Sequence, residues 1–159
     1  MDYKELYLKY KKKYLHAKNT MKGGSYNLSN KITNNIDFLQ SLKEYINSKQ
    51  VTVDGKSIDP NQNLLLIIFA PWCSHCKDLI TNEANELEDN ELSGNIRFID
   101  GDDLQENNNE INELKNILEP RGYPTILKIS KDSTMDSIKK EEFMGGERTA
   151  SNLINFLKE

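Results

Sequence analysis

The chain of 159 residues is long enough for one domain and an appendage. Hydrophobic residues make up 36% and charged residues 29%, which is typical of a soluble protein, and no apolar run reaches the roughly 18–20 residues of a membrane span. The net charge of −4 is unevenly spread: residues 1–24 hold seven lysines against two acidic residues and carry +5, which leaves −9 on the rest. The acidic main part argues against nucleic-acid binding, whereas the basic head suits an acidic partner or surface.

The first 24 residues predict an amphipathic helix rich in tyrosine and lysine. Its apolar stripe repeats at alternating spacings of four and three residues and consists of Tyr3, Tyr7, Tyr10, Tyr14, Ala17 and Met21. Such a helix packs on its own domain, docks on a partner or a second copy, or lies on a membrane surface, and the sequence leaves these three roles open. A polar linker is expected over residues 25–33, and the main domain over residues 34–159.

The main domain begins with a predicted helix over about residues 34–48. Its buried face is expected to consist of Ile36, Leu39, Leu42, Tyr45 and Ile46. Asp54-Gly55 lies between two short β-prone runs and predicts a small hairpin within residues 51–58. The apolar run of residues 64–70 is typical of a central strand that is covered on both faces.

Helix and strand patterns alternate through the rest of the chain. They are a helix over residues 73–87, a strand over 96–100, a helix over 109–118, strands over 125–129 and 139–144 that pair antiparallel, and a helix over 149–157. This order predicts an α/β domain in which helices flank a central mixed sheet.

Cys73 and Cys76 stand at the start of the helix that follows the central strand. The N-terminus lacks the apolar stretch of a secretory signal, so a reducing compartment is expected, where a close pair is more often redox-active or metal-binding than structural. Disulfide exchange needs one ionised, accessible thiol and a second thiol within reach to release the mixed disulfide. The free N–H groups at a helix N-terminus favour Cys73 as the thiolate, and Cys76, one turn further in, is expected to be the shielded resolving thiol.

The neighbours of the pair have two interpretations each. A cationic His75 imidazole would stabilise the Cys73 thiolate and make the disulfide a better oxidant, or His75 is an exposed residue without an electrostatic role. Trp72 packs against the turn of the active site and helps to bind substrate, or is an ordinary surface tryptophan. Zinc needs about four ligands, and His16 and His75 are the only histidines. We therefore expect no metal and no bound cofactor, only the redox-active pair itself.

Three segments resemble the protein disulfide isomerase branch of the thioredoxin superfamily. Residues 69–77, FAPWCSHCK, resemble its active-site segment. Residues 121–126, RGYPTI, resemble its cis-proline segment, and Pro124 lies 51 residues after Cys73. Residues 143–149, FMGGERT, resemble its final strand and the start of its last helix. The resemblance spans roughly residues 34–159 and implies a thioredoxin fold.

The resemblance also implies roles for matched residues. Cys73 is the attacking cysteine and Cys76 the resolving one. Pro124 is expected to follow a cis peptide bond, found for only about 5–6% of X–Pro bonds, and to face the disulfide. Tyr123 would offer its backbone to an extended substrate, although without the resemblance Tyr123-Pro124 reads as a loop. Arg148 is expected near the resolving cysteine, with a surface arginine as the alternative.

The chain departs from the family at a buried ion pair. Ile67 stands six residues before Cys73, where the family usually has a carboxylate that helps to deprotonate the resolving thiol. Phe98 stands at the expected place of the paired lysine. Such a replacement need not cost stability, but it removes the usual proton acceptor for Cys76. The sequence therefore predicts slow release of mixed disulfides.

The N-terminal segment, residues 1–24, resembles a different group of proteins. Residues 7–15 and 22–24 resemble an N-terminal segment of proteins from giant DNA viruses of the mimivirus type. This implies a viral protein in the host cytoplasm or the virion, where such viruses often run a disulfide pathway with a flavin sulfhydryl oxidase. Gly23-Gly24 resembles a cleavage site of some viral proteases, or is a plain linker.

The sequence thus predicts an enzyme, a thiol–disulfide oxidoreductase that acts on protein thiols and disulfides. His75 and the isomerase-like context favour oxidation or isomerisation over reduction. Two alternatives remain: a virion component that binds a partner through the tyrosine-rich helix, and an electron carrier for a viral sulfhydryl oxidase.

Overall fold

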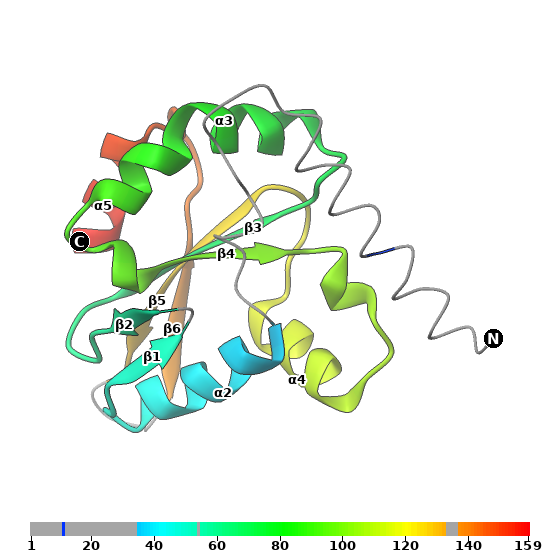
Figure 1. Ribbon diagram of the computed structural model, residues 1–159, viewed down its shortest axis with the longest axis vertical. Helices are drawn as coiled ribbons and strands as arrows, with labels where there is room; N and C mark the ends of the chain where they lie inside the picture. Colours follow the sequence, from blue (N-terminus) through cyan, green and yellow to red (C-terminus); the bar gives the residue numbers. More distant parts are fainter. Residues whose placement is uncertain (1–10, 12–34, 54, 133–136) are drawn as a thin grey trace. The chain divides into compact units, whose positions relative to one another are not determined.

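The computed structural model describes residues 11, 35–53, 55–132 and 137–159 (Figure 1). The chain divides into two compact units, Met1–Ile32 and Thr33–Glu159. The helix expected over residues 1–24 and the linker expected over 25–33 lie outside the described residues, apart from Lys11. All the helices and strands given below belong to the second unit, and none of its described helices is long and apolar enough to cross a bilayer.

Four strands form one mixed sheet in the order β4-β3-β5-β6. β3 (Leu64–Phe69) runs parallel to β4 (Ile96–Asp100) and antiparallel to β5 (Thr125–Lys131), and β5 pairs antiparallel with β6 (Ile138–Glu142). Every residue of β3 is buried, as the apolar run predicted. The antiparallel pairing of the last two strands is also confirmed, with β6 one residue earlier at its start and two shorter at its end than predicted.

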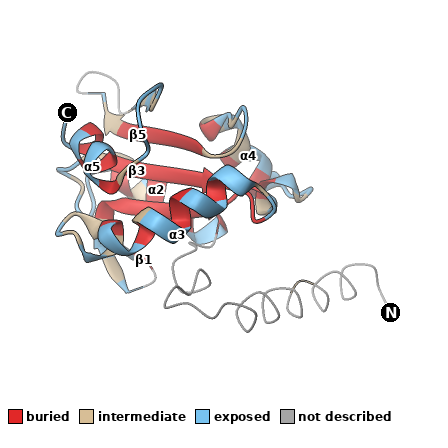
Figure 2. Cartoon of the chain, turned by 90° about the horizontal axis from the view of Figure 1, so that it is seen from above, coloured by how far each residue is buried: buried red, intermediate tan, exposed pale blue. Residues whose placement is uncertain are grey.

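Helices cover both faces of this sheet (Figure 1). α3 (Ser74–Asp89) and α5 (Ala150–Lys158) lie on one face, and α2 (Asn35–Ile46) and α4 (Asn109–Leu118) lie on the other. In Figure 2, strands β3 and β5 are buried and α3 turns an exposed side to solvent, while the residues of edge strand β6 alternate between partly buried and exposed. The predicted α/β architecture is confirmed, while two short 3₁₀ helices, η2 (Ser93–Asn95) and η3 (Asp103–Gln105), were not predicted.

The buried face of α2 differs from the predicted one at two positions. Ile36 is 41% exposed, and Ile46 is only partly buried. The predicted Leu39, Leu42 and Tyr45 are buried, together with Phe38, which was not predicted. Because Ile36 precedes Phe38 by two residues, the two side chains point about 200° apart around the helix.

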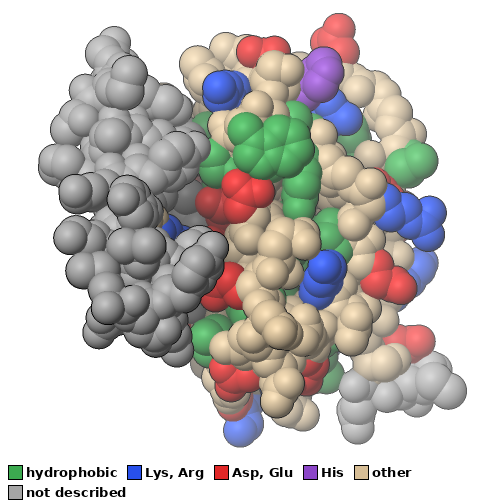
Figure 3. Space-filling model, turned by 90° about the vertical axis from the view of Figure 1, so that its right-hand side faces the viewer, with side chains coloured by type: hydrophobic (Ala, Val, Ile, Leu, Met, Phe, Trp, Pro, Cys, Tyr) green, Lys and Arg blue, Asp and Glu red, His purple; other side chains and the backbone are tan. Residues whose placement is uncertain are grey.

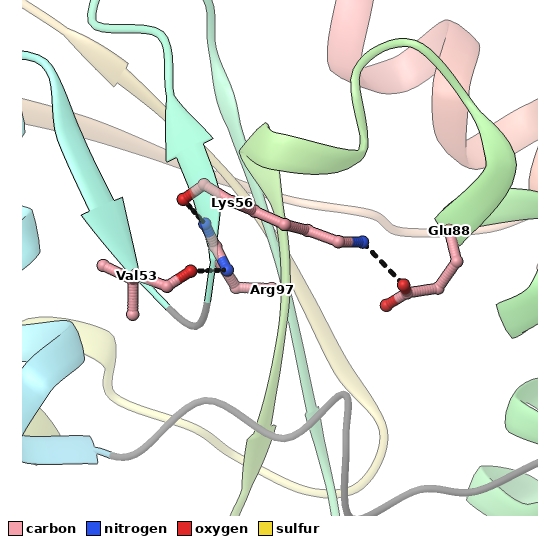
Figure 4. A network of polar contacts seen from close by, with 4 residues as sticks. All are labelled: Val53, Lys56, Glu88 and Arg97. Carbon is pink, nitrogen blue, oxygen red and sulfur yellow. Dashed lines mark hydrogen bonds and ion pairs between the residues drawn. The ribbon is translucent and has the colours of Figure 1, made fainter.

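A two-stranded hairpin packs against the edge of the sheet. β1 (Val51–Val53) and β2 (Lys56–Ile58) pair antiparallel, as predicted, and Gly55 has a φ of +76°, which favours glycine. The guanidinium of Arg97 on β4, only 3% exposed, donates to the backbone oxygens of Val53 and Lys56, each at 3.0 Å (Figure 4). This buried arginine attaches the hairpin to β4.

Candidate active site

The two cysteines lie where β3 gives way to α3. Cys73 is the N-cap residue of α3, with extended backbone (φ −81°, ψ 120°), and its carbonyl accepts the first helical hydrogen bond from Lys77 N at 3.1 Å. Cys73 is partly exposed, whereas Cys76 is fully buried. The helix start therefore presents one reachable thiol and encloses the other.

Several groups around Cys73 favour its thiolate. Burial alone would raise the pKa of the Cys73 thiol. This effect is outweighed by hydrogen bonds from the backbone N–H and thiol of Cys76, by the backbone N–H of His75, and by the positive charge of Arg148, so the pKa falls below its ordinary value. The N–H groups of a first helical turn have no partner within the helix, which is why they are available to a thiolate at this position.

Cys76 has the opposite character. Burial, together with the hydrogen bond and charge of Cys73, raises the pKa of Cys76 to about 12, against smaller opposing effects of the Ala70 backbone and Arg148. Ile67 and Phe98 are register partners on β3 and β4 and are almost completely buried. The predicted apolar pair is therefore present, and neither of its members can accept a proton from Cys76.

The loop before β5 contacts Cys73 through its backbone. The Tyr123–Pro124 peptide bond is cis, as predicted. The Cys73 thiol donates to the carbonyl oxygen of Tyr123 across 3.5 Å. Thr125 Oγ1 donates to Gly122 O at 2.6 Å and closes the loop on itself. The backbone that the sequence analysis assigned to substrate binding thus lies directly beside the reachable thiol.

Trp72 lies next to this loop and is exposed to solvent. Its side chain is 66% exposed, its indole Nε1 donates to Asp102 Oδ1 at 3.0 Å, and its ring meets that of Tyr123 edge-on, with centroids 5.9 Å apart. Gly101 allows this arrangement, because a Cβ at that position would lie 2.2 Å from Tyr123 Cε1. Figure 3 looks onto this end of the sheet, where hydrophobic and acidic side chains lie next to each other.

Gly101 and Asp102 were not predicted as residues of the site. A signal was present, since Asp100-Gly101-Asp102 directly follows the second core strand. Parallel strands end at the same edge of a sheet, so residues that follow β4 come close to residues that follow β3.

Arg148 lies exposed in the turn between β6 and α5, and its positive charge lowers the pKa of both thiols. This turn contains Gly145 and Gly146, with φ values of +115° and +85° that favour glycine. A groove of about 350 Å³ lies between α3 and the turn and is lined by His75, Asp78, Leu79, Asn82, Glu83 and Gly146–Thr149. His75 is exposed, and the group through which it lowers the Cys73 pKa is its backbone N–H. The role expected for its imidazole stays a prediction.

Within the described part of the chain, no three histidine, cysteine or acidic side chains gather as metal ligands would.

Comparison with known proteins defines the class of this site. The thioredoxin family model matches residues 44–159, and the chain belongs to this family. Within it, the chain is 33% identical over 105 residues to "Protein disulfide-isomerase" of Oryctolagus cuniculus, which covers 65% of this chain and 19% of that protein. It is 34% identical over 94 residues to "Protein disulfide-isomerase A6 homolog" of Drosophila melanogaster, covering 58% of this chain and 19% of that protein.

The chain spans less than a fifth of the length of these curated relatives. Among solved structures, the first thioredoxin domain of mouse "Protein disulfide-isomerase A4" is 25% identical, with a TM-score of 0.42 and coverage of 61% of each chain.

Proposed function

We propose that the protein is a thiol–disulfide oxidoreductase that works through Cys73 and Cys76. The observation that carries the proposal is the contrast between the two thiols: one is accessible and acidified by the helix start, and the other is buried, hydrogen-bonded to the first and hard to ionise. Such a pair separates the attacking role from the resolving role.

The proposed reaction balances without a bound cofactor. The Cys73 thiolate attacks a substrate disulfide, so a Cys73–substrate disulfide forms while the substrate S–S bond breaks and one substrate thiolate leaves. Cys76 then loses its proton and attacks Cys73 Sγ, which releases the second substrate thiolate and forms the Cys73–Cys76 disulfide. The substrate gains two electrons and the protein loses two. The reverse sequence transfers the disulfide to a substrate dithiol.

The surroundings of Cys76 favour isomerisation over net reduction. Ile67 and Phe98 supply no base, and the Cys76 thiol has a raised pKa, so the second step is slow. A long-lived mixed disulfide gives another thiolate of the same substrate time to attack. That attack rearranges the substrate disulfides with no net change in the oxidation state of the protein.

The partners that we propose are protein thiols and disulfides, with a flavin sulfhydryl oxidase as the acceptor that would reoxidise the pair. A viral protein in the host cytoplasm or the virion is the proposed setting, and its support is the resemblance of residues 7–15 and 22–24. The apolar pair of Ile67 and Phe98 also favours a second candidate, a virion component that binds a partner with little turnover.

Turnover of a fluorescent disulfide peptide tests the main proposal. We expect Cys73→Ser to abolish catalysed exchange and Cys76→Ser to leave a mixed disulfide on the protein. Glu86→Ala, an exposed substitution on the same helix, serves as the control and should retain wild-type turnover. Wild-type turnover by Cys73→Ser contradicts the proposal. The reduction potential then decides the direction: about −180 mV is typical of an isomerase and about −270 mV of a reductant.

A further inference from the structure

The turn that carries Arg148 is tied to the helix that carries the thiols. Glu83 lies on α3, and its Oε2 accepts a hydrogen bond from the backbone N–H of Ala150 at 2.7 Å. Ala150 is the first residue of α5 and follows Arg148 by two residues. A second bond holds the other side of Arg148, because Asn152 Nδ2 donates to Glu147 O at 2.8 Å.

Helix geometry gives Glu83 a fixed relation to the thiols. Cys76 and Glu83 are seven residues apart, about two helical turns, so they stand on the same side of α3. This side is otherwise apolar, with Leu79 before Glu83 and Leu87 after it, both buried. Glu83 is itself only partly exposed, and its carboxylate meets the N-terminus of α5, where free N–H groups attract negative charge.

We propose that Glu83 is a positioning residue that holds Arg148 beside Cys73 and Cys76. This inference rests on the proposed function, since placement of a cation at the thiols matters when Cys73 is the attacking group. The glycines at 145 and 146 leave the preceding part of the turn without side chains to fix it. The bond from Glu83 therefore supplies a restraint that originates in the same helix as the two sulfur atoms.

Two electrostatic effects of Glu83 have opposite signs, which makes the inference testable. Acting directly, a carboxylate disfavours a nearby thiolate, so its removal would lower the thiol pKa. Acting through Arg148, Glu83 favours the thiolate, because the charge of Arg148 lowers the pKa of both thiols. The other titratable or charged groups lining the groove are His75, Asp78 and Glu147, and they are left unchanged in every variant.

The experiment is the pH profile of Cys73 alkylation by iodoacetamide in the full, reduced chain, with adducts located by mass spectrometry. Glu83→Ala should raise the pH at which alkylation of Cys73 reaches half its maximal rate, here called the midpoint, by about half a pKa unit, which is the scale of one exposed charge. Below the midpoint, alkylation should therefore be about threefold slower. Glu83→Gln keeps an oxygen that can accept from Ala150 and should not raise the midpoint. Glu86→Ala is the control for loss of a carboxylate elsewhere on α3.

Two further variants keep the test decisive. Ala150→Pro removes the donated N–H while retaining Glu83 and Arg148; proline is tolerated at the first position of a helix, and Thr149 before it is already extended (φ −78°, ψ 153°). It should raise the midpoint as Glu83→Ala does. With Arg148→Met present, Glu83→Ala should cause no further rise.

A midpoint that stays unchanged or falls in both Glu83→Ala and Ala150→Pro overturns the inference. So does a rise that persists in full with Arg148→Met. Because alkylation needs no disulfide substrate, these outcomes are independent of turnover. A chain that fails to exchange disulfides contradicts the proposed function without deciding the role of Glu83.

Discussion

Alkaline pH should destabilise the reduced protein through Cys76. The pKa of this thiol is raised from 9.0 to about 12 in the folded protein, mainly by burial. Below about pH 9 the thiol is protonated in both the folded and the unfolded states, and its contribution to stability is constant. Above that pH the unfolded chain loses the proton while the folded chain keeps it, so stability falls as the pH rises toward 12.

The expected loss follows from the two pKa values. A pH of about 11 lies about two units above the Cys76 pKa in the unfolded chain and still below its pKa in the folded protein. Each unit corresponds to about 1.4 kcal/mol, so the free energy of unfolding should drop by about 3 kcal/mol relative to about pH 8.

Denaturant unfolding of reduced wild type and of Cys76→Ala, at both pH values, measures this loss. Tyr45, whose pKa is also raised to about 12, is common to both proteins, and its contribution cancels in the difference. Wild type should lose about 3 kcal/mol more than Cys76→Ala. An equal loss in the two proteins would refute the reasoning that Cys76 ionises with difficulty in the fold.

Four further substitutions are predicted from the contacts described above. Gly101→Ala should displace the Tyr123 ring, because the added Cβ would lie 2.2 Å from ring carbon Cε1, and we expect slower exchange with a peptide substrate. Arg97→Met should lower the free energy of unfolding by about 2–4 kcal/mol, because one buried and one partly buried backbone oxygen lose a charged donor. Lys56→Met, which removes a partly exposed ion pair with Nζ and carboxylate 2.6 Å apart, should cost less than about 1 kcal/mol in the same denaturation assay. Ile67→Glu should accelerate the release of mixed disulfides at some cost in stability. An unchanged release rate would show that the lack of a base at this position does not limit the step.

Local patterns predicted the elements of the fold well. The strand over residues 96–100 and the helix over 109–118 have the predicted bounds, because their apolar periodicities are clear and turn or capping residues flank them. The buried face of α2 was wrong at Ile36 because a helix with several apolar residues offers more than one possible stripe. Only packing against the sheet selects the one that contains Phe38.

The contacts that complete the site depend on tertiary structure. Trp72 and Asp102 are 30 residues apart, and Glu83 and Ala150 are 67 apart. Arg97 reaches Val53 across 44 residues. No local pattern encodes such pairs. The two cysteines were predictable because their spacing is itself a motif, and the proline segment was predictable through its resemblance to the family.

The site of a trapped mixed disulfide tests the central claim most directly. Cys76→Ala and Cys73→Ala proteins, each incubated with a disulfide-containing peptide, can be digested and their adducts located by mass spectrometry. We predict a peptide on Cys73 in the first protein and no comparable adduct on Cys76 in the second, since Cys76 is fully buried. Absence of an adduct on Cys73, or equally fast capture by Cys76, would contradict the account.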